Sequence, residues 1–147
     1  MRTKLLLLVA GFATAAGCAT PRLRTVSGRP EVTVHASTAA VRTATINYLV
    51  DRGFAPVKTG GSQLVFQQQG SVTQDFIMGL LTNEPQSLTR VTITLVDVGP
   101  DVRVVAGIAA VGRNTFGRQQ EVELTGKGYS AMQQALERIK ASAEAGR

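Results

Sequence analysis

The sequence of 147 residues has few of the side chains that hold metals or stack on ligands: one Cys, one His, no Trp, and 5% aromatic residues. A single Cys and a single His exclude a zinc finger, a disulfide framework and any closed Cys/His metal cage. We therefore expect neither a metal nor a cofactor. The scarcity of aromatic residues argues against a platform that stacks on bases or sugars. With 44% apolar and 18% charged residues, the composition is typical of one globular domain.

Acidic residues are in the minority, and the formal net charge is +6. The excess of basic charge, however, lies at the start of the chain. Five of the sixteen basic residues precede the first acidic residue: Arg2, Lys4, Arg22, Arg24 and Arg29. The other eleven stand against ten acidic residues, so the segment 31–147 carries about +1. Recognition of nucleic acid needs clustered Lys and Arg on the domain itself, and we expect no nucleic-acid partner.

The first twenty residues have the pattern of an export signal. Two basic residues lie within the first four, and an apolar stretch of twelve residues, 5–16, follows them. This stretch is too short to cross a membrane, which takes about 20 residues, and it fits the apolar region of a signal peptide. It runs into Ala15-Ala16-Gly17-Cys18. Small residues before a lone Cys resemble the lipobox of bacterial lipoproteins, although Ala15 stands where that family most often has Leu.

The resemblance implies a lipid anchor at Cys18. In that family the Cys thiol receives a diacylglyceryl group, the peptide is cut before the Cys, and the new N-terminus is acylated. Asp after the Cys retains such proteins in the inner membrane, and this chain has Ala19 there. The resemblance therefore implies the outer membrane, on the face toward the periplasm. Each buried methylene contributes about 0.8 kcal/mol, so several acyl chains hold a small domain to a bilayer essentially permanently.

The alternative is an ordinary secretory signal. Ala15-Ala16-Gly17 satisfies the small-x-small rule for cleavage without a lipid, and the same rule is met two residues earlier. Cleavage of this kind would leave Cys18 as a free thiol close to the new terminus.

The chain is thus expected to have three parts. Residues 1–17 are the signal peptide, residues 18–30 are the lipidated N-terminus with a basic tether, and residues 31–147 are a single α+β domain. The three Arg residues of the tether lie either against anionic headgroups, at about 1 kcal/mol each, or in solvent, where their charge keeps the linker extended.

Hydrophobic periodicity predicts the elements of the domain. A helix is expected between Ser37 or Thr38, either of which can cap it, and Gly53, which stops it. Gly60-Gly61 predicts a hairpin, and Pro56 indicates that the first strand of this hairpin is irregular or at an edge. Strands are expected over residues 31–35, 54–58, 63–69, 88–98, 102–111 and 121–124, with a second helix over 129–143.

This order of elements predicts an α+β fold, in which an antiparallel curved sheet carries an early helix and a C-terminal helix packed on one face. In element order alone, the domain is similar to the helix-grip domains of outer-membrane assembly lipoproteins. Such a likeness implies an envelope setting and leaves the activity open.

One segment departs from the sheet pattern. Between residues 72 and 81 the apolar side chains fall on one helical face: Val72, Phe76, Ile77, Leu80 and Leu81. One hypothesis is a docking helix that contacts a partner protein, a lipid or the membrane surface. The other is a short helix packed on the core, since most apolar helical stripes face a core.

Candidate catalytic residues are few. His35 is the only His, and the period-two pattern of its strand turns it outward. Glu121 and Glu123 share one strand face about 7 Å apart, a spacing seen in hydrolases but more often on a solvated face. Asp97 and Asp101 flank a turn, where Asp is common for turn geometry. We therefore expect no catalytic residues and no enzymatic activity.

Three functions from different classes remain, in decreasing order of support. The first is a non-catalytic envelope lipoprotein whose domain binds another protein, in an assembly or secretion complex. The second is a module that binds a small apolar ligand or lipid between sheet and helix, in a cavity lined by residues such as Val104, Ile108 and Leu136. The third is an enzyme built on His35 or on the pair of glutamates.

The lipid anchor predicts a defined mass for the mature protein. Membrane-bound protein is expected to begin at Cys18 and to carry three acyl chains, as measured by intact-mass spectrometry of the membrane fraction. Cys18→Ser is expected to release the protein from the membrane or to trap the precursor. An unmodified terminus at Ala16 or Cys18, or unchanged fractionation of the variant, would contradict the anchor.

Overall fold

The computed structural model describes residues 23–69, 88–113 and 119–146. In chain order the described elements are β1 (Glu31–Val34), α1 (Thr38–Val50), β2 (Ala55–Lys58), β3 (Gln63–Gln69), β4 (Leu88–Val98), β5 (Asp101–Arg113), β6 (Gln119–Glu123) and α2 (Lys127–Ala145). The segment 72–81 and Cys18 lie outside the described residues.

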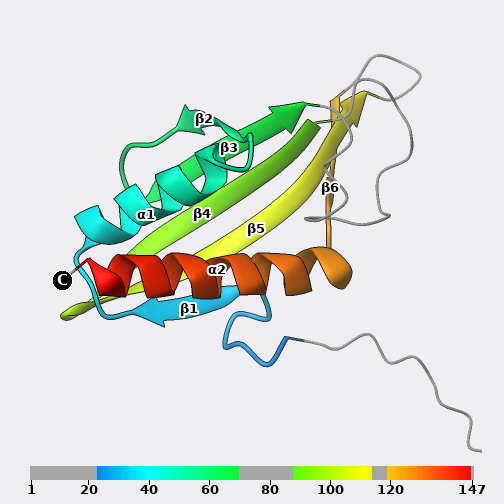
Figure 1. Ribbon diagram of the computed structural model, residues 1–147. Coiled ribbons are helices and arrows are strands. Elements are labelled where there is room, and N and C mark those ends of the chain that lie inside the picture. Colours follow the sequence, from blue (N-terminus) through cyan, green and yellow to red (C-terminus); the bar gives the residue numbers. More distant parts are fainter. Residues whose placement is uncertain (1–22, 70–87, 114–118, 147) are drawn as a thin grey trace, which may run out of the picture.

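The strands form one antiparallel sheet in the order β1-β5-β4-β3-β2, and β6 also pairs with β5. β1 pairs with residues 102–105 of β5, and β6 pairs with residues 109–113, so both short strands lie along the same side of β5. The long strands curve, and α1 and α2 lie on one face of the sheet (Figure 1). The α+β fold with an early and a C-terminal helix on one face is therefore confirmed.

Local signals set the ends of α1 as expected. The Ser37 hydroxyl accepts a hydrogen bond from the Ala40 N–H at 3.2 Å and so caps the first turn. Beyond the last turn, Gly53 has a φ of +83°, a backbone conformation that residues other than glycine rarely adopt. Both ends of this helix were thus predictable from single residues.

Three elements are longer than the periodicity predicts. β5 runs from Asp101 to Arg113, because it pairs with β4 from its first residue and with β6 to its last. β6 begins at Gln119, two residues early. α2 already begins at Lys127, although its N-cap, Gly126, makes no side-chain hydrogen bond. Cross-strand pairing and packing extend these elements, and neither can be recognised from the hydrophobic periodicity of the segment itself.

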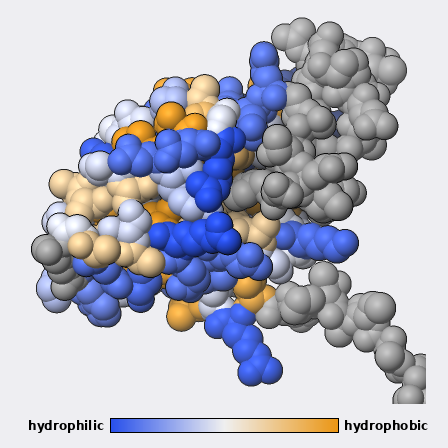
Figure 2. Space-filling model, in the orientation of Figure 1, coloured by the Kyte–Doolittle hydropathy of each residue, from blue (hydrophilic) through white to orange (hydrophobic). Residues whose placement is uncertain are grey.

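The core lies between the sheet and the two helices. Along β4, Val91, Ile93 and Leu95 are buried while Thr92 and Thr94 are partly exposed, as expected for a strand with one covered face. The helices contribute residues such as Leu49, Met132, Leu136 and Ile139, all fully buried. Seen from the side of the helices, the outer surface is mostly hydrophilic, with smaller apolar patches scattered over it (Figure 2).

Truncating one core residue measures this packing. Leu136→Ala is expected to lower the free energy of unfolding by about 2–5 kcal/mol, because it leaves a cavity among packed side chains. The matched control on the same helix is Arg138→Ala, an exposed position, with an expected change within about 0.5 kcal/mol. Urea denaturation of the two variants compares them directly, and a loss below about 1 kcal/mol for Leu136→Ala would place that side chain outside the core.

Candidate functional site

The face of the sheet opposite the helices is the candidate site, since no described element packs over it. Its side chains alternate with the core residues and include Thr92, Thr94, Arg103 and Val105, all partly exposed. At the end of β4 that leads into the β4–β5 turn, Val96 and Val98 on this face are 43% and 52% exposed. These two valines make a small exposed apolar patch at this end of the face.

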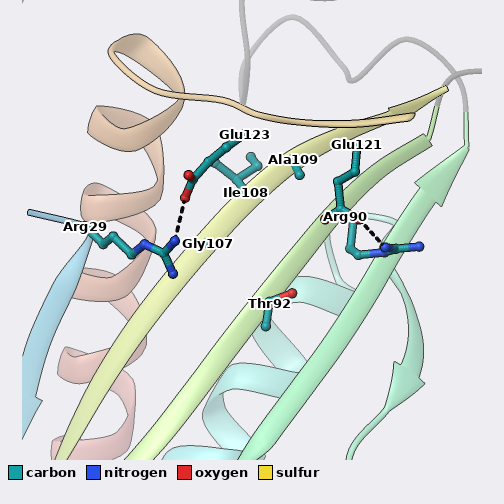
Figure 3. A pocket seen from close by; sticks show the side chains of 8 residues that line it. All are labelled: Arg29, Arg90, Thr92, Gly107, Ile108, Ala109, Glu121 and Glu123. Atoms are coloured by element: carbon teal, nitrogen blue, oxygen red, sulfur yellow. Dashed lines mark hydrogen bonds and ion pairs between the residues drawn. The ribbon is translucent and has the colours of Figure 1, made fainter. Parts of the chain in front are cut away.

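A shallow hollow of about 320 Å³ lies on this face where β4, β5 and β6 meet. Its floor is made by Thr92, Gly107 and Ala109 (Figure 3). Gly107 has no side chain, and a Cβ built there would meet nothing within 4 Å. The hollow therefore exists because a small residue stands in the middle of a long strand.

Charged side chains line the rim of the hollow in two ion pairs (Figure 3). Arg29, just before β1, reaches Glu123 at 3.2 Å, and Arg90 of β4 reaches Glu121 at 2.6 Å. When the Gln67 amide is turned so that its oxygen faces Arg90, that oxygen accepts two further bonds at 3.0 and 3.1 Å. Exposed pairs of this kind contribute little to stability, so the rim is available to interact with a ligand or partner.

The residues just before β1 are also held on this side of the domain. The Pro30 carbonyl accepts a hydrogen bond from the Ala106 N–H, so it continues the pairing of β1 with β5. The Ser27 N–H donates to the Glu31 carboxylate at 3.2 Å. Together with the ion pair of Arg29, these contacts bring the chain into the domain beside the hollow.

A third pair, Glu31 with Arg103, has a different character. The Arg103 guanidinium donates two hydrogen bonds to the two carboxylate oxygens of Glu31, at 2.7 and 3.0 Å, and the Glu31 side chain is only 10% exposed. These bonds lower the pKa of Glu31 from 4.5 to about 2. The pair joins β1 to β5 and so fixes the strand that follows Arg29.

Tyr129 at the start of α2 holds Glu123, a residue of the rim, from the side of the helix. Its hydroxyl donates a 2.6 Å hydrogen bond to the Glu123 carboxylate. Burial, and then this bond, raise the pKa of Tyr129. Glu123 is thus held by Tyr129 and Arg29, both of which bond the same carboxylate oxygen.

In the described sheet, β1, β2 and β6 each pair with one strand only, so each has an edge to which no strand is paired. The edge of β1 is covered by α2. The Gln133 side chain bonds both the N–H and the C=O of Glu31, at 2.8 and 3.1 Å. Lys140 donates to the Thr33 carbonyl at 2.8 Å. Glu144 accepts from the His35 N–H at 2.9 Å. Side chains of α2 therefore bond four of the backbone groups that an edge strand normally leaves open.

The edge of β2 is protected against pairing with a further strand in another way. Because the Leu95 N–H donates to the Ser62 carbonyl, the even-numbered residues of β3 bond β4 and the odd-numbered ones face β2. Pro56 then occupies the position in β2 whose N–H would point away from the sheet, and the register shifts between Pro56 and Lys58. Proline, a bulge and a lysine are common protections of edge strands. The expectation of an edge strand at Pro56 is confirmed.

The structure separates the two candidate catalytic groups. The exposed His35 side chain bonds Asp101 at 2.7 Å, while Asp97 accepts a hydrogen bond from the Thr38 hydroxyl. Glu121 and Glu123 share one face, as expected, but they stand opposite Val111 and Ala109. From the start of β5 to Ala109 the strand rises by about 27 Å, so His35 and the glutamates do not form one site.

The remaining expected contacts fall into two groups. Val104, Ile108 and Leu136, named as the lining of an apolar cavity, are fully buried members of the core cluster. The expected partner or lipid contacts all lie outside the described residues: Val72, Phe76, Ile77, Leu80 and Leu81. Arg90 and Gly107, which shape the hollow, were assigned no function from the sequence, and Arg29 was expected only as part of the basic tether. The one available signal was Arg90, which lies on the same face of β4 as Thr92 and Thr94 and puts a charged side chain next to this row of threonines.

In the ranges 23–69, 88–113 and 119–146, no cluster of three or more His, Cys, Asp or Glu residues is arranged to hold a metal ion. Neither described helix has the length and apolar character needed to cross a membrane.

The chain matches no protein-family model, and the search of curated proteins finds no significant relative.

The lowered pKa of Glu31 predicts a pH dependence of stability. The carboxylate stabilises the fold fully above its ordinary pKa of 4.5, and this contribution is lost as the pH falls toward about 2. Between pH 6 and pH 3, Glu31→Gln is therefore expected to lose less free energy of unfolding than the wild type. Arg103→Gln removes the partner and is expected to flatten the same pH profile, as measured by urea denaturation. Parallel profiles for all three proteins would contradict the assignment.

Proposed function

We propose that the protein is a lipid-anchored envelope protein, held through Cys18 at the periplasmic face of the outer membrane, whose domain binds another protein without catalysis. The single observation that carries the binding role is the asymmetry of the sheet. Both helices cover one face, while the other face presents exposed valines and a hollow with a charged rim. A surface that combines apolar and charged side chains in this way fits a protein-binding face.

The entry of the chain into the domain supports an anchored orientation. Arg29 lines the hollow and lies eleven residues after Cys18. Eleven residues span at most about 40 Å. A lipid on Cys18 would therefore keep the binding face close to the membrane, where an envelope partner meets it.

The second expected function, binding of an apolar ligand between sheet and helix, receives less support. It required a cavity lined by Val104, Ile108 and Leu136, and these side chains are packed against one another in the core cluster. A ligand at that place would have to displace core side chains, each worth several kcal/mol of packing.

In-cell photo-crosslinking tests the binding face. A photoreactive residue at Thr92, on the floor of the hollow, is expected to give a discrete protein adduct in the membrane-anchored protein. The matched control is Gln134, exposed on the outer side of α2, where no adduct is expected. A probe at Phe76 tests the segment 72–81 in the same experiment. Absence of an adduct from Thr92, or equal adducts from Thr92 and Gln134, would overturn the proposal.

A further inference from the structure

The third edge of the sheet, that of β6, has a regular geometry. Leu124 N–H donates to the Ile108 carbonyl, and the register is continuous from Glu123 opposite Ala109 to Gln119 opposite Arg113. In an antiparallel pair this places the backbone groups of the even-numbered residues of β6 toward β5. The N–H and C=O groups of Gln119, Glu121 and Glu123 therefore point away from the sheet.

Within the described residues, β6 lacks the protections found at the other two edges. The edge of β1 is bonded by side chains of α2, and the edge of β2 carries Pro56 and a bulge. In β6 all five residues are exposed, the sequence Gln-Gln-Glu-Val-Glu has no proline, and the register does not shift. A straight, exposed edge is a template for a further strand.

We propose that β6 accepts an added antiparallel strand from the partner protein, an extended segment with Lys or Arg at alternate positions. This inference rests on the proposed protein-binding function and names how that partner is held. The basic residues of the segment lie opposite Glu121 and Glu123, and a residue with apolar character lies beside Val122, which is 59% exposed. Backbone hydrogen bonds supply the pairing, and the alternate side chains supply the selectivity.

The charges of β6 favour such a partner. Glu121 and Glu123 lie on the same face as the hollow, and nearly half of each side chain is exposed. Each pairs with its arginine through one carboxylate oxygen, unlike Glu31, which uses both. A cationic side chain from an adjacent strand can therefore join the rim, and opposite charges directly across two strands stabilise the pairing.

The same charges argue against a second copy of this chain as the added strand. Two β6 strands related by a two-fold axis at Glu121, the register that pairs the whole strand, would place Glu121 opposite Glu121 of the other copy, and an axis at Val122 would place Glu121 opposite Glu123. Like charges directly opposite each other destabilise a pair of strands. The edge thus selects a strand of opposite charge.

Proline at position 121 removes both an outward backbone N–H and a carboxylate of the rim, so Glu121→Ala, which removes the carboxylate alone and is expected to lower the adduct yield less, is compared with it. Glu121→Pro removes an N–H that points away from β5 and leaves the β5–β6 hydrogen bonds in place. With the photoreactive probe at Thr92 of the anchored protein, this variant is expected to lower the adduct yield at least tenfold. Thr33→Pro, at an equivalent outward position in the covered strand β1, is the matched control and is expected to keep the wild-type yield.

A second variant keeps the test independent of proline. Glu121→Gln combined with Glu123→Gln retains every backbone group and removes the two charges, and a severalfold lower yield is expected. Mass spectrometry of the adduct from a probe at Val122 is expected to map the crosslink to a segment with alternating basic residues.

The outcomes distinguish this inference from the proposed function. An adduct at Thr92 that persists in both the proline and the double glutamine variants would overturn strand addition and leave the binding face intact. An adduct from Val122 with the mass of a second copy of this chain would overturn it in favour of self-association. Absence of any adduct in the wild type would overturn the proposed function itself.

Discussion

The structure depends on the complete pairing of β5. On one side this strand pairs with β4 over residues 101–111, and on the other it pairs first with β1 and then with β6. Every backbone group in a buried strand needs a partner, and a strand of thirteen residues needs more partners than β1 alone supplies. Two short strands from distant parts of the chain therefore share one side of β5. As a result, Arg29, just before β1, and Glu123, at the end of β6, form an ion pair beside β5.

Helix α2 has two effects on this arrangement. Its apolar side buries Met132, Leu136 and Ile139 over the sheet, and its polar side bonds the free edge of β1 through Gln133, Lys140 and Glu144. These hydrogen bonds protect the edge of β1, whereas the described side chains of α2 make no such bonds to the backbone of β6. Among the residues that the structure describes, the sheet consequently has one face covered by the helices, one face over which no element packs, and an edge, that of β6, to which no strand is paired. The protein-binding role that we propose is based on that asymmetry.

Much of the fold follows from local patterns in the chain. The alternation of β4, the cap at Ser37, the stop at Gly53 and the edge position of Pro56 are each readable from a few neighbouring residues, because each depends on local geometry. The candidate site is different. Glu121 and Glu123 were visible as a pair on one strand face, but their partners Arg29 and Arg90 are separated from them by 94 and 31 residues of chain. The role of Gly107 could not be inferred from the sequence, because it depends on the neighbouring strands that surround the hollow.

By itself, the sequence determined the class of the fold, the absence of a Cys/His metal cage and the pattern of an N-terminal export signal, since composition and short-range periodicity are properties of neighbouring residues. Only the tertiary structure decided which strands flank β5, which edge α2 covers, and that His35 lies far from the glutamates. These outcomes depend on pairings between distant residues. Such pairings are selected by the burial of the whole core and by the satisfaction of all backbone hydrogen bonds together, and no single segment contains that information.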